Sequence, residues 1–245
     1  MLKNGIVVQY MMINLELNIE KLREEFKEKR SLEVLDFLNR GDADRMFDFL
    51  NGGMDETWWS ASFLAHDIDG GQPIHLRRIP RNEIPIAKME GAVLESFNSG
   101  SFSYYFDRTT SHATGCHCLE CQFKWFLHSP EVLNFIRTVS GEEVTKSQEV
   151  FSSRFVGSQF LSPHHDLNKG KIGFVYSLTR DWKTQYGGNL HMMEYDYKTV
   201  TRIVTPKYNR LTMFHIPSAD GIPHFVSHVV PIVRTKRLSI TGWFS

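Results

Sequence analysis

The chain has 245 residues, of which 41% are hydrophobic and 23% charged, and its formal net charge is zero. This is ordinary globular composition, and a balanced charge gives no attraction to nucleic acid or to an anionic membrane surface. No apolar run approaches the roughly 20 residues that a membrane-spanning helix needs, so we expect no membrane partner either. The three cysteines do not resemble a secreted disulfide framework, and no signal peptide is recognisable, which predicts a reducing, cytoplasmic setting.

The first 149 residues show mainly helical patterns. Asn18 is a candidate N-cap for a helix that extends to about residue 29, and Asp42 for a short helix that ends at Gly52-Gly53. Further helices are predicted at 83–97, with Pro85 in the first turn, and at 120–127 and 130–139. Strands are predicted at 5–13, 32–38, 58–65 and 101–108, and a loop at 67–80.

From residue 150 the pattern changes to short strands separated by turn residues. They are expected near 151–156, 159–164, 172–178, 188–193, 199–204, 210–215, 224–230 and 236–244. About eight strands suit a closed double-sheet jelly roll, with the N-terminal helices packed on one sheet. We therefore predict a mainly β, α+β fold in one domain over 1–245, in which 1–149 give helical support and outer strands and 150–245 form the jelly-roll catalytic core.

His164 and Asp166 are the first candidate metal ligands. They are separated by one residue, so on an extended strand both side chains lie on the same face. His228 is the candidate third ligand, because two histidines and one carboxylate form the facial set of non-heme Fe(II) oxygenases. The alternatives are a polar loop after Pro163 and a solvent-facing strand histidine at 228.

Arg237 lies nine residues after His228, in the sequence Arg-Leu-Ser. An arginine fork beside the hydroxyl of Ser239 suits a carboxylate such as the distal end of a bound 2-oxo acid. The alternative is that Arg237 is one more charge in a basic run. His224 is the nearest rival to His228, and the spacing to Arg237 favours His228.

Taken together, these motifs resemble the Fe(II)/2-oxoglutarate-dependent dioxygenases of the prolyl 4-hydroxylase type. The likeness is greatest to the eukaryotic ribosomal-protein prolyl hydroxylases. It covers about residues 151–245, where it includes Gly187-Gly188-Asn189-Leu190, Tyr208-Asn209-Arg210-Leu211 and the closing Arg-Leu-Ser-Ile-Thr-Gly-Trp-Phe. The sequence departs from the family pattern at Ser177, where relatives often carry a tyrosine that contacts 2-oxoglutarate, and at Phe155.

The resemblance implies iron at His164, Asp166 and His228, which would be the catalytic and metal-binding set. It implies 2-oxoglutarate at Arg237 and Ser239, with Tyr176 and Leu190 as further cosubstrate contacts. The implied cofactors are Fe(II) and 2-oxoglutarate, with ascorbate as a stimulant. The carboxylate of Asp166 leaves no coordination position for a halide, so we expect hydroxylation and not halogenation.

Three functions remain open at this stage. The first is hydroxylation of a free amino acid or another small metabolite, which the compact size slightly favours. The second is peptidyl-prolyl hydroxylation of a proline-containing protein, which the C-terminal resemblance favours. The third, an inactive barrel used for binding, is disfavoured by the intact His, Asp and Arg set.

Cys116, His117, Cys118 and Cys121 form a separate cluster of candidate ligands, with His112 nearby. Zinc accepts three thiolates and one imidazole, so the ligand types for a second metal are available. One short segment rarely supplies all four ligands, however. The sequence therefore favours reduced cysteines at the start of a helix, and the zinc alternative stays open.

Overall fold

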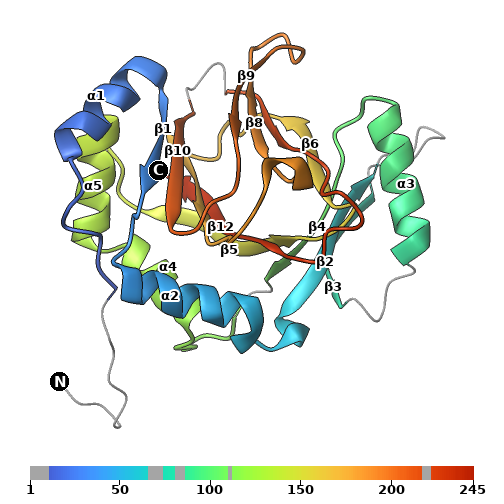
Figure 1. Ribbon diagram of the computed structural model, residues 1–245, viewed down its shortest axis with the longest axis horizontal. Helices are drawn as coiled ribbons and strands as arrows, with labels where there is room; N and C mark the ends of the chain where they lie inside the picture. The colour runs from blue at the N-terminus through green and yellow to red at the C-terminus, as the bar shows by residue number, and fades with distance from the viewer. Residues whose placement is uncertain (1–10, 66–73, 81–85, 110–111, 217–221) are drawn as a thin grey trace.

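A computed structural model describes residues 11–65, 74–80, 86–109, 112–216 and 222–245. Twelve strands of the described residues form one antiparallel sheet that curls into a half-barrel, with helices outside it (Figure 1). The main path of the sheet runs in the order β1-β10-β7-β12-β5-β4-β6-β11-β8-β9, and β2 and β3 extend it beside β4. The fold is therefore the predicted jelly roll with helical support.

The strands of the C-terminal half lie near the expected short segments, except that β11 covers only three residues of the strand expected at 224–230. In the described residues the sheet has twelve strands. They are β1 (Ser31–Leu35), β2 (Trp59–Ala65), β3 (Ile74–Pro80), β4 (Tyr104–Thr109), β5 (Ser147–Phe155), β6 (Phe160–His164), β7 (Ile172–Ser177), β8 (Leu190–Met193), β9 (Val200–Val204), β10 (Arg210–His215), β11 (His224–Val226) and β12 (Arg237–Phe244). The α-helices are α1 (Ile19–Lys29), α2 (Arg40–Asp48), α3 (Ile86–Asn98), α4 (Leu119–Leu127) and α5 (Pro130–Ser140).

Strand alternation gives the sheet two different faces. On β12, Leu238 and Ile240 pack into the larger hydrophobic core, under α1, α2, α4 and α5. Arg237 and Ser239, the residues before and between them, line a cavity inside the half-barrel. Because neighbouring side chains on a strand point to opposite faces, each of these strands supports a rigid core on one side and a site on the other.

Helix α3 covers a different part of the sheet from the other four helices (Figure 1). Its residues Met89 and Val93 pack on Phe63 of β2, Tyr105 of β4 and Phe160 of β6. The prediction that N-terminal helices support the barrel is thus confirmed, with α3 forming a separate buttress.

Three local predictions differ from the structure. The N-cap of α2 is Asn39, whose side chain accepts from the Asp42 backbone N–H at 2.9 Å, so Asp42 is not the cap. The strand expected at 32–38 ends at Leu35, and the loop expected at 67–80 contains β3. Most of the strand expected at 5–13, and Pro85, lie outside the described residues.

The N-terminus of helix α1 was predicted correctly, because its cap depends on the local sequence. Asn18 caps it as expected, accepting from the Lys21 N–H at 3.0 Å.

Among the helices of the described ranges, none has the length and apolar character that a membrane span requires. The single-domain division and the cytoplasmic setting stay predictions.

Asn209, just before β10, holds the segment that follows β1 by hydrogen bonds to Leu38. Its buried side chain accepts from the Leu38 N–H at 3.0 Å and from the Tyr176 hydroxyl at 2.9 Å, and it donates to the Leu38 carbonyl at 2.8 Å. Its φ of 51° lies in the left-handed region, where asparagine is tolerated better than most residues. A single side chain therefore satisfies three buried polar groups.

We expect Asn209→Ala to lower the free energy of unfolding by about 3 kcal/mol, because each of three buried hydrogen bonds contributes about 1 kcal/mol. Tyr176→Phe, which removes only one of them, should cost about 1 kcal/mol. Urea denaturation followed by circular dichroism measures both. If both variants lost the same small amount of unfolding free energy, the three hydrogen bonds of Asn209 would not be stabilising this region.

Candidate active site

Three side chains that can bind a metal ion lie together inside the half-barrel. His164 ends β6, Asp166 follows it, and His224 begins β11. His164 and His224 are direct partners in the register of the two strands. Their ligand atoms and a carboxylate oxygen of Asp166 all lie within 4.8 Å of one another, which is close enough to bind one metal ion.

Both imidazoles present the same nitrogen to the carboxylate. His164 Nε2 lies 3.7 Å from Asp166 Oδ1, and His224 Nε2 lies 3.5 Å from Asp166 Oδ2. His164 Nδ1 donates to the Ser162 carbonyl at 3.0 Å, and His224 Nδ1 donates to the Ile222 carbonyl at 2.9 Å. Because a carbonyl oxygen can only accept, each Nδ1 carries the proton and each Nε2 keeps a lone pair for a metal.

The Asp166 carboxylate is oriented by Trp243 of β12. The indole Nε1 donates to Asp166 Oδ2 at 2.9 Å, while the ammonium of Lys169 lies 5.5 Å from the centre of the same indole ring. Burial, and then the neighbouring His224, lower the pKa of His164 to about 4, so this imidazole is neutral at pH 7. Two imidazoles and one oriented carboxylate are the donor set that non-heme iron takes in oxygenases.

His228, the expected third ligand, is not part of this group, and the prediction was wrong. Strand β11 ends at Val226, and its register with β6 shifts between His224 and Val226. The His228 ring instead stacks on Phe160, with centroids 4.1 Å apart, and meets Phe97 of α3 edge-on at 4.9 Å. The same-face relation between His224 and His228 is lost because the strand stops.

Gly187 accounts for the path that the chain takes after β11. It forms an isolated bridge with Val229, and a Cβ built on it would lie 1.9 Å from the His228 carbonyl oxygen. Its φ of +71° also favours glycine. Only glycine at this position lets the backbone of His228 and Val229 pack so closely against the segment before β8.

A cavity of about 490 Å³ joins the metal ligands to Arg237. Its wall includes His164, Asp166 and His224 together with Arg237 and Ser239 of β12. The Arg237 guanidinium is buried, lies 4.8 Å from the Phe155 ring centre, and donates through Nη1 to Ser239 Oγ at 3.2 Å. Burial lowers the pKa of Arg237 to about 10, so it remains positively charged at neutral pH.

Arg237 has no ion-pair partner among the residues that the structure describes, and its buried Nε has no hydrogen-bond acceptor there. A buried charge is costly unless it is paired. The guanidinium therefore fits an anion that enters the cavity, as a dicarboxylate cosubstrate would.

The remaining predicted contacts divide between the two faces of the sheet. Ser239 and Leu190 line the cavity as expected. Tyr176 does not, because on β7 it is Val175 that faces the cavity. Tyr176 is fully buried on the opposite face, stacked 5.3 Å from Phe123 of α4, so its assignment to the cosubstrate was wrong.

Sequence reasoning missed two functional residues, His224 and Trp243. The signal for His224 was present, since it was the nearest rival to His228, but the point where β11 ends is set by tertiary contacts. Trp243 closes the final predicted strand, and nothing in the local sequence shows that its indole reaches Asp166. Tyr104 of β4 also lines the cavity without having been assigned a role.

Comparisons with known proteins agree with this geometry. Residues 150–245 match the family model described as the 2OG-Fe(II) oxygenase superfamily. No match was found among curated protein sequences.

Three solved structures share the fold over most of the chain. An oxidoreductase of the 2OG-Fe(II) oxygenase family from Burkholderia pseudomallei is 13% identical, covers 98% of this chain and 96% of its own, and has a TM-score of 0.58. A prolyl-4-hydroxylase from Pseudomonas putida is 14% identical, with 92% and 97% coverage and a TM-score of 0.54. A prolyl hydroxylase from Trichoplax adhaerens is 15% identical, with 92% and 88% coverage and a TM-score of 0.59.

At these identities the structural neighbours show the fold alone. The family match covers the segment that contains His164, Asp166, His224 and Arg237. It confirms the enzyme class predicted from the sequence, a dioxygenase that uses Fe(II) and 2-oxoglutarate.

Proposed function

We propose that the protein hydroxylates an amino-acid-type substrate. His164, Asp166 and His224 would hold Fe(II), and Arg237 with Ser239 would hold the distal carboxylate of 2-oxoglutarate. The observation that carries this proposal is the single cavity that joins the three metal-binding side chains to a buried, unpaired guanidinium.

Bound iron with 2-oxoglutarate and dioxygen would supply the oxidising chemistry, in which one oxygen atom passes to succinate, with loss of carbon dioxide, and the other to the hydroxylated substrate. The chain's own residues bind, orient and exclude water. The Nδ1–H bonds of His164 and His224 fix both rings, and Trp243 fixes the carboxylate. Aromatic side chains on the cavity wall limit water access, namely Phe102, Tyr104, Phe106, Phe151, Phe155 and Phe214.

The size and charge of the cavity support a small substrate. Its volume of about 490 Å³ lies in the lower half of the usual range for ligand pockets, and 2-oxoglutarate must share it. Side chains of both signs line it, with Arg108 of β4, Glu149 of β5 and Lys169. Lys169 Nζ pairs with Glu149 at 2.9 Å. A zwitterionic amino acid is complementary to such a mixed set of charges.

A second candidate is hydroxylation of prolyl residues in a protein. It is supported by neighbours described as prolyl hydroxylases, one of them in complex with a peptide fragment of the hypoxia inducible factor oxygen degradation domain. The narrower resemblance to ribosomal-protein prolyl hydroxylases, carried by the motifs of the C-terminal half, belongs to this candidate.

Succinate formation separates the two candidates. The protein is incubated with Fe(II), ascorbate and 2-oxoglutarate, either with single free amino acids or with proline-containing peptides, and Asp166→Ala serves as the inactive control. We expect succinate equimolar with a hydroxylated free amino acid. Coupled turnover with peptides alone would replace our proposal with the second candidate, and no succinate under any condition would contradict both.

The ligand assignment predicts opposite results for two nearby histidines. His224→Ala should lower the affinity for Fe(II) at least tenfold and abolish 2-oxoglutarate turnover, because it removes one of three protein ligands. His228→Ala, on the same segment, should keep both within about twofold, since the His228 ring only packs on Phe160 and Phe97.

Anaerobic Fe(II) titration and the succinate assay measure these properties, and circular dichroism checks that both variants are folded. Loss of iron in His228→Ala with retention in His224→Ala would restore the original assignment.

The assignment of Arg237 to the 2-oxoglutarate carboxylate predicts how its variants bind this cosubstrate. Each charge-assisted hydrogen bond contributes about 1.5–3 kcal/mol, so Arg237→Ala should raise the apparent constant for 2-oxoglutarate by about one to three orders of magnitude. Arg237→Lys should lie between the two, because lysine keeps the charge but loses the fork. Ser239→Ala should have a smaller effect, since it removes one neutral group.

Lys236→Ala is the matched control. Lys236 Nζ donates to the Asn51 carbonyl at 3.0 Å and lies 3.6 Å from Glu56, and it does not line the cavity. Titration of 2-oxoglutarate at fixed iron should leave this variant unchanged. Equal weakening by Lys236→Ala and Arg237→Ala would disprove the carboxylate site.

A further inference from the structure

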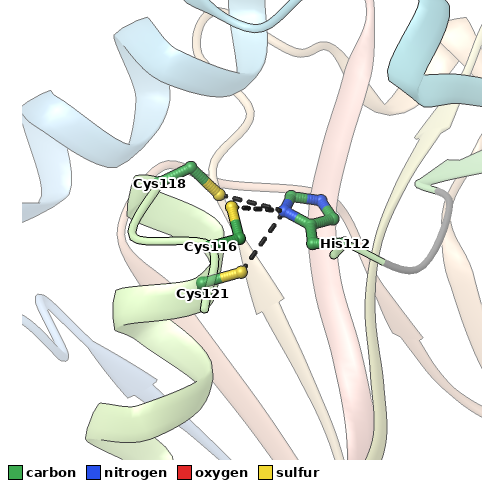
Figure 2. A group of neighbouring side chains, drawn as sticks. All are labelled: His112, Cys116, Cys118 and Cys121. Atoms are coloured by element: carbon green, nitrogen blue, oxygen red, sulfur yellow. Dashed lines mark hydrogen bonds between the residues drawn. The ribbon is translucent and has the colours of Figure 1, made fainter. Parts of the chain in front are cut away.

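Four side chains with metal-binding atoms meet outside the half-barrel, between the end of β4 and the start of α4. Figure 2 shows the sulfurs of Cys116, Cys118 and Cys121 converging on the ring of His112. The distances from His112 Nδ1 to the three Sγ atoms are 3.4, 3.1 and 3.3 Å, in that order along the chain. All three cysteines are free thiols.

We propose that this cluster is a structural zinc site of the Cys3His type. Tetrahedral zinc has bonds of about 2.3 Å to sulfur and 2.0–2.1 Å to nitrogen, which places sulfur and nitrogen about 3.6 Å apart around one ion. The observed separations are slightly shorter, so a small side-chain movement admits the ion. Thiolate ligands select zinc over the harder cations, and four protein ligands leave no open position, as in structural sites.

The far side of the His112 ring is held as zinc-bound histidines usually are. His112 Nε2 lies 3.0 Å from Oε2 of Glu120, a fully buried carboxylate. A carboxylate behind a histidine orients the ring and makes the other nitrogen a better ligand. Here Glu120 turns Nδ1 toward the three cysteines.

Glu120 also links the cluster to the sheet. Its Oε1 accepts from the Thr109 hydroxyl at 2.7 Å and from the Ser152 backbone N–H at 3.2 Å, and it pairs with Lys124 at 3.0 Å. Ser152 belongs to β5, and its neighbour Ser153 lines the active-site cavity. Zinc at this position would fix the segment before α4 and brace the β5 wall of the cavity.

His117, the fourth ligand considered from the sequence, lies elsewhere. It is exposed and packs edge-on against Trp125, with ring centroids 5.2 Å apart. The histidine that completes the set is His112, which precedes the cysteines and lies three residues after the end of β4. One stretch of ten residues, 112–121, therefore supplies all four ligands, and Figure 2 shows their side chains facing one another.

The zinc content of the purified chain tests the proposal. Elemental analysis of wild-type protein, purified without chelators, should give about one zinc per chain. Cys118→Ser and Cys121→Ser should each lose most of it. His117→Ala, the matched control, should keep it, as should His164→Ala/His224→Ala, in which zinc bound adventitiously at the iron site is removed.

Cobalt substitution keeps the test decisive if the cysteine variants do not fold. Wild-type protein loaded with Co²⁺ should show thiolate-to-cobalt charge-transfer absorption and tetrahedral d–d bands, and a mercurial reagent should release the metal as it modifies the thiols. The proposal is overturned if wild-type protein holds no zinc and its cobalt form lacks these bands. It is also overturned if zinc is lost in His164→Ala/His224→Ala and retained in folded Cys118→Ser.

Discussion

The orientation of the Asp166 carboxylate is the constraint on which the active site depends. The carboxylate is buried, faces the Nε2 atoms of His164 and His224 at 3.7 and 3.5 Å, and accepts from the Trp243 indole at 2.9 Å. Each contact comes from a different strand, so the group forms only when β6, β11 and β12 are all in place. A buried carboxylate beside a neutral imidazole favours a bound cation, which gives the fold a direct energetic link to metal binding.

The alternation of side chains along the strands separates the hydrophobic core from the cavity that contains Asp166. On β7 and β12, alternate residues pack under the helices, and residues between them line the cavity. The helical support therefore fixes the positions of Arg237, Ser239 and Val175 without approaching them. The Cys3His cluster would add a second brace to β5 through Glu120 and the Ser152 backbone.

The sequence was sufficient where the information was local or periodic. Asn18 caps α1, the late strands fall near their expected positions, and His164 with Asp166 shares one face as the alternation required. The sequence was insufficient where tertiary contacts decide which side chain reaches a site. The register shift and the early end of β11 select His224 over His228, and the chain after β11 packs on Gly187, which is distant in the sequence. Tyr176 was assigned to the wrong face of β7, where the neighbouring Val175 lines the cavity. His112 was noted beside the cysteines, but the sequence could not show that it, and not His117, meets the three sulfurs.

An anomalous diffraction measurement at the iron edge tests the central claim most directly. Crystals would be loaded anaerobically with Fe(II) and 2-oxoglutarate. The account predicts one iron peak bound by His164 Nε2, Asp166 and His224 Nε2, with a 2-oxoglutarate carboxylate on the Arg237 guanidinium in the same cavity. A peak beside His228, or 2-oxoglutarate bound away from Arg237, would contradict it.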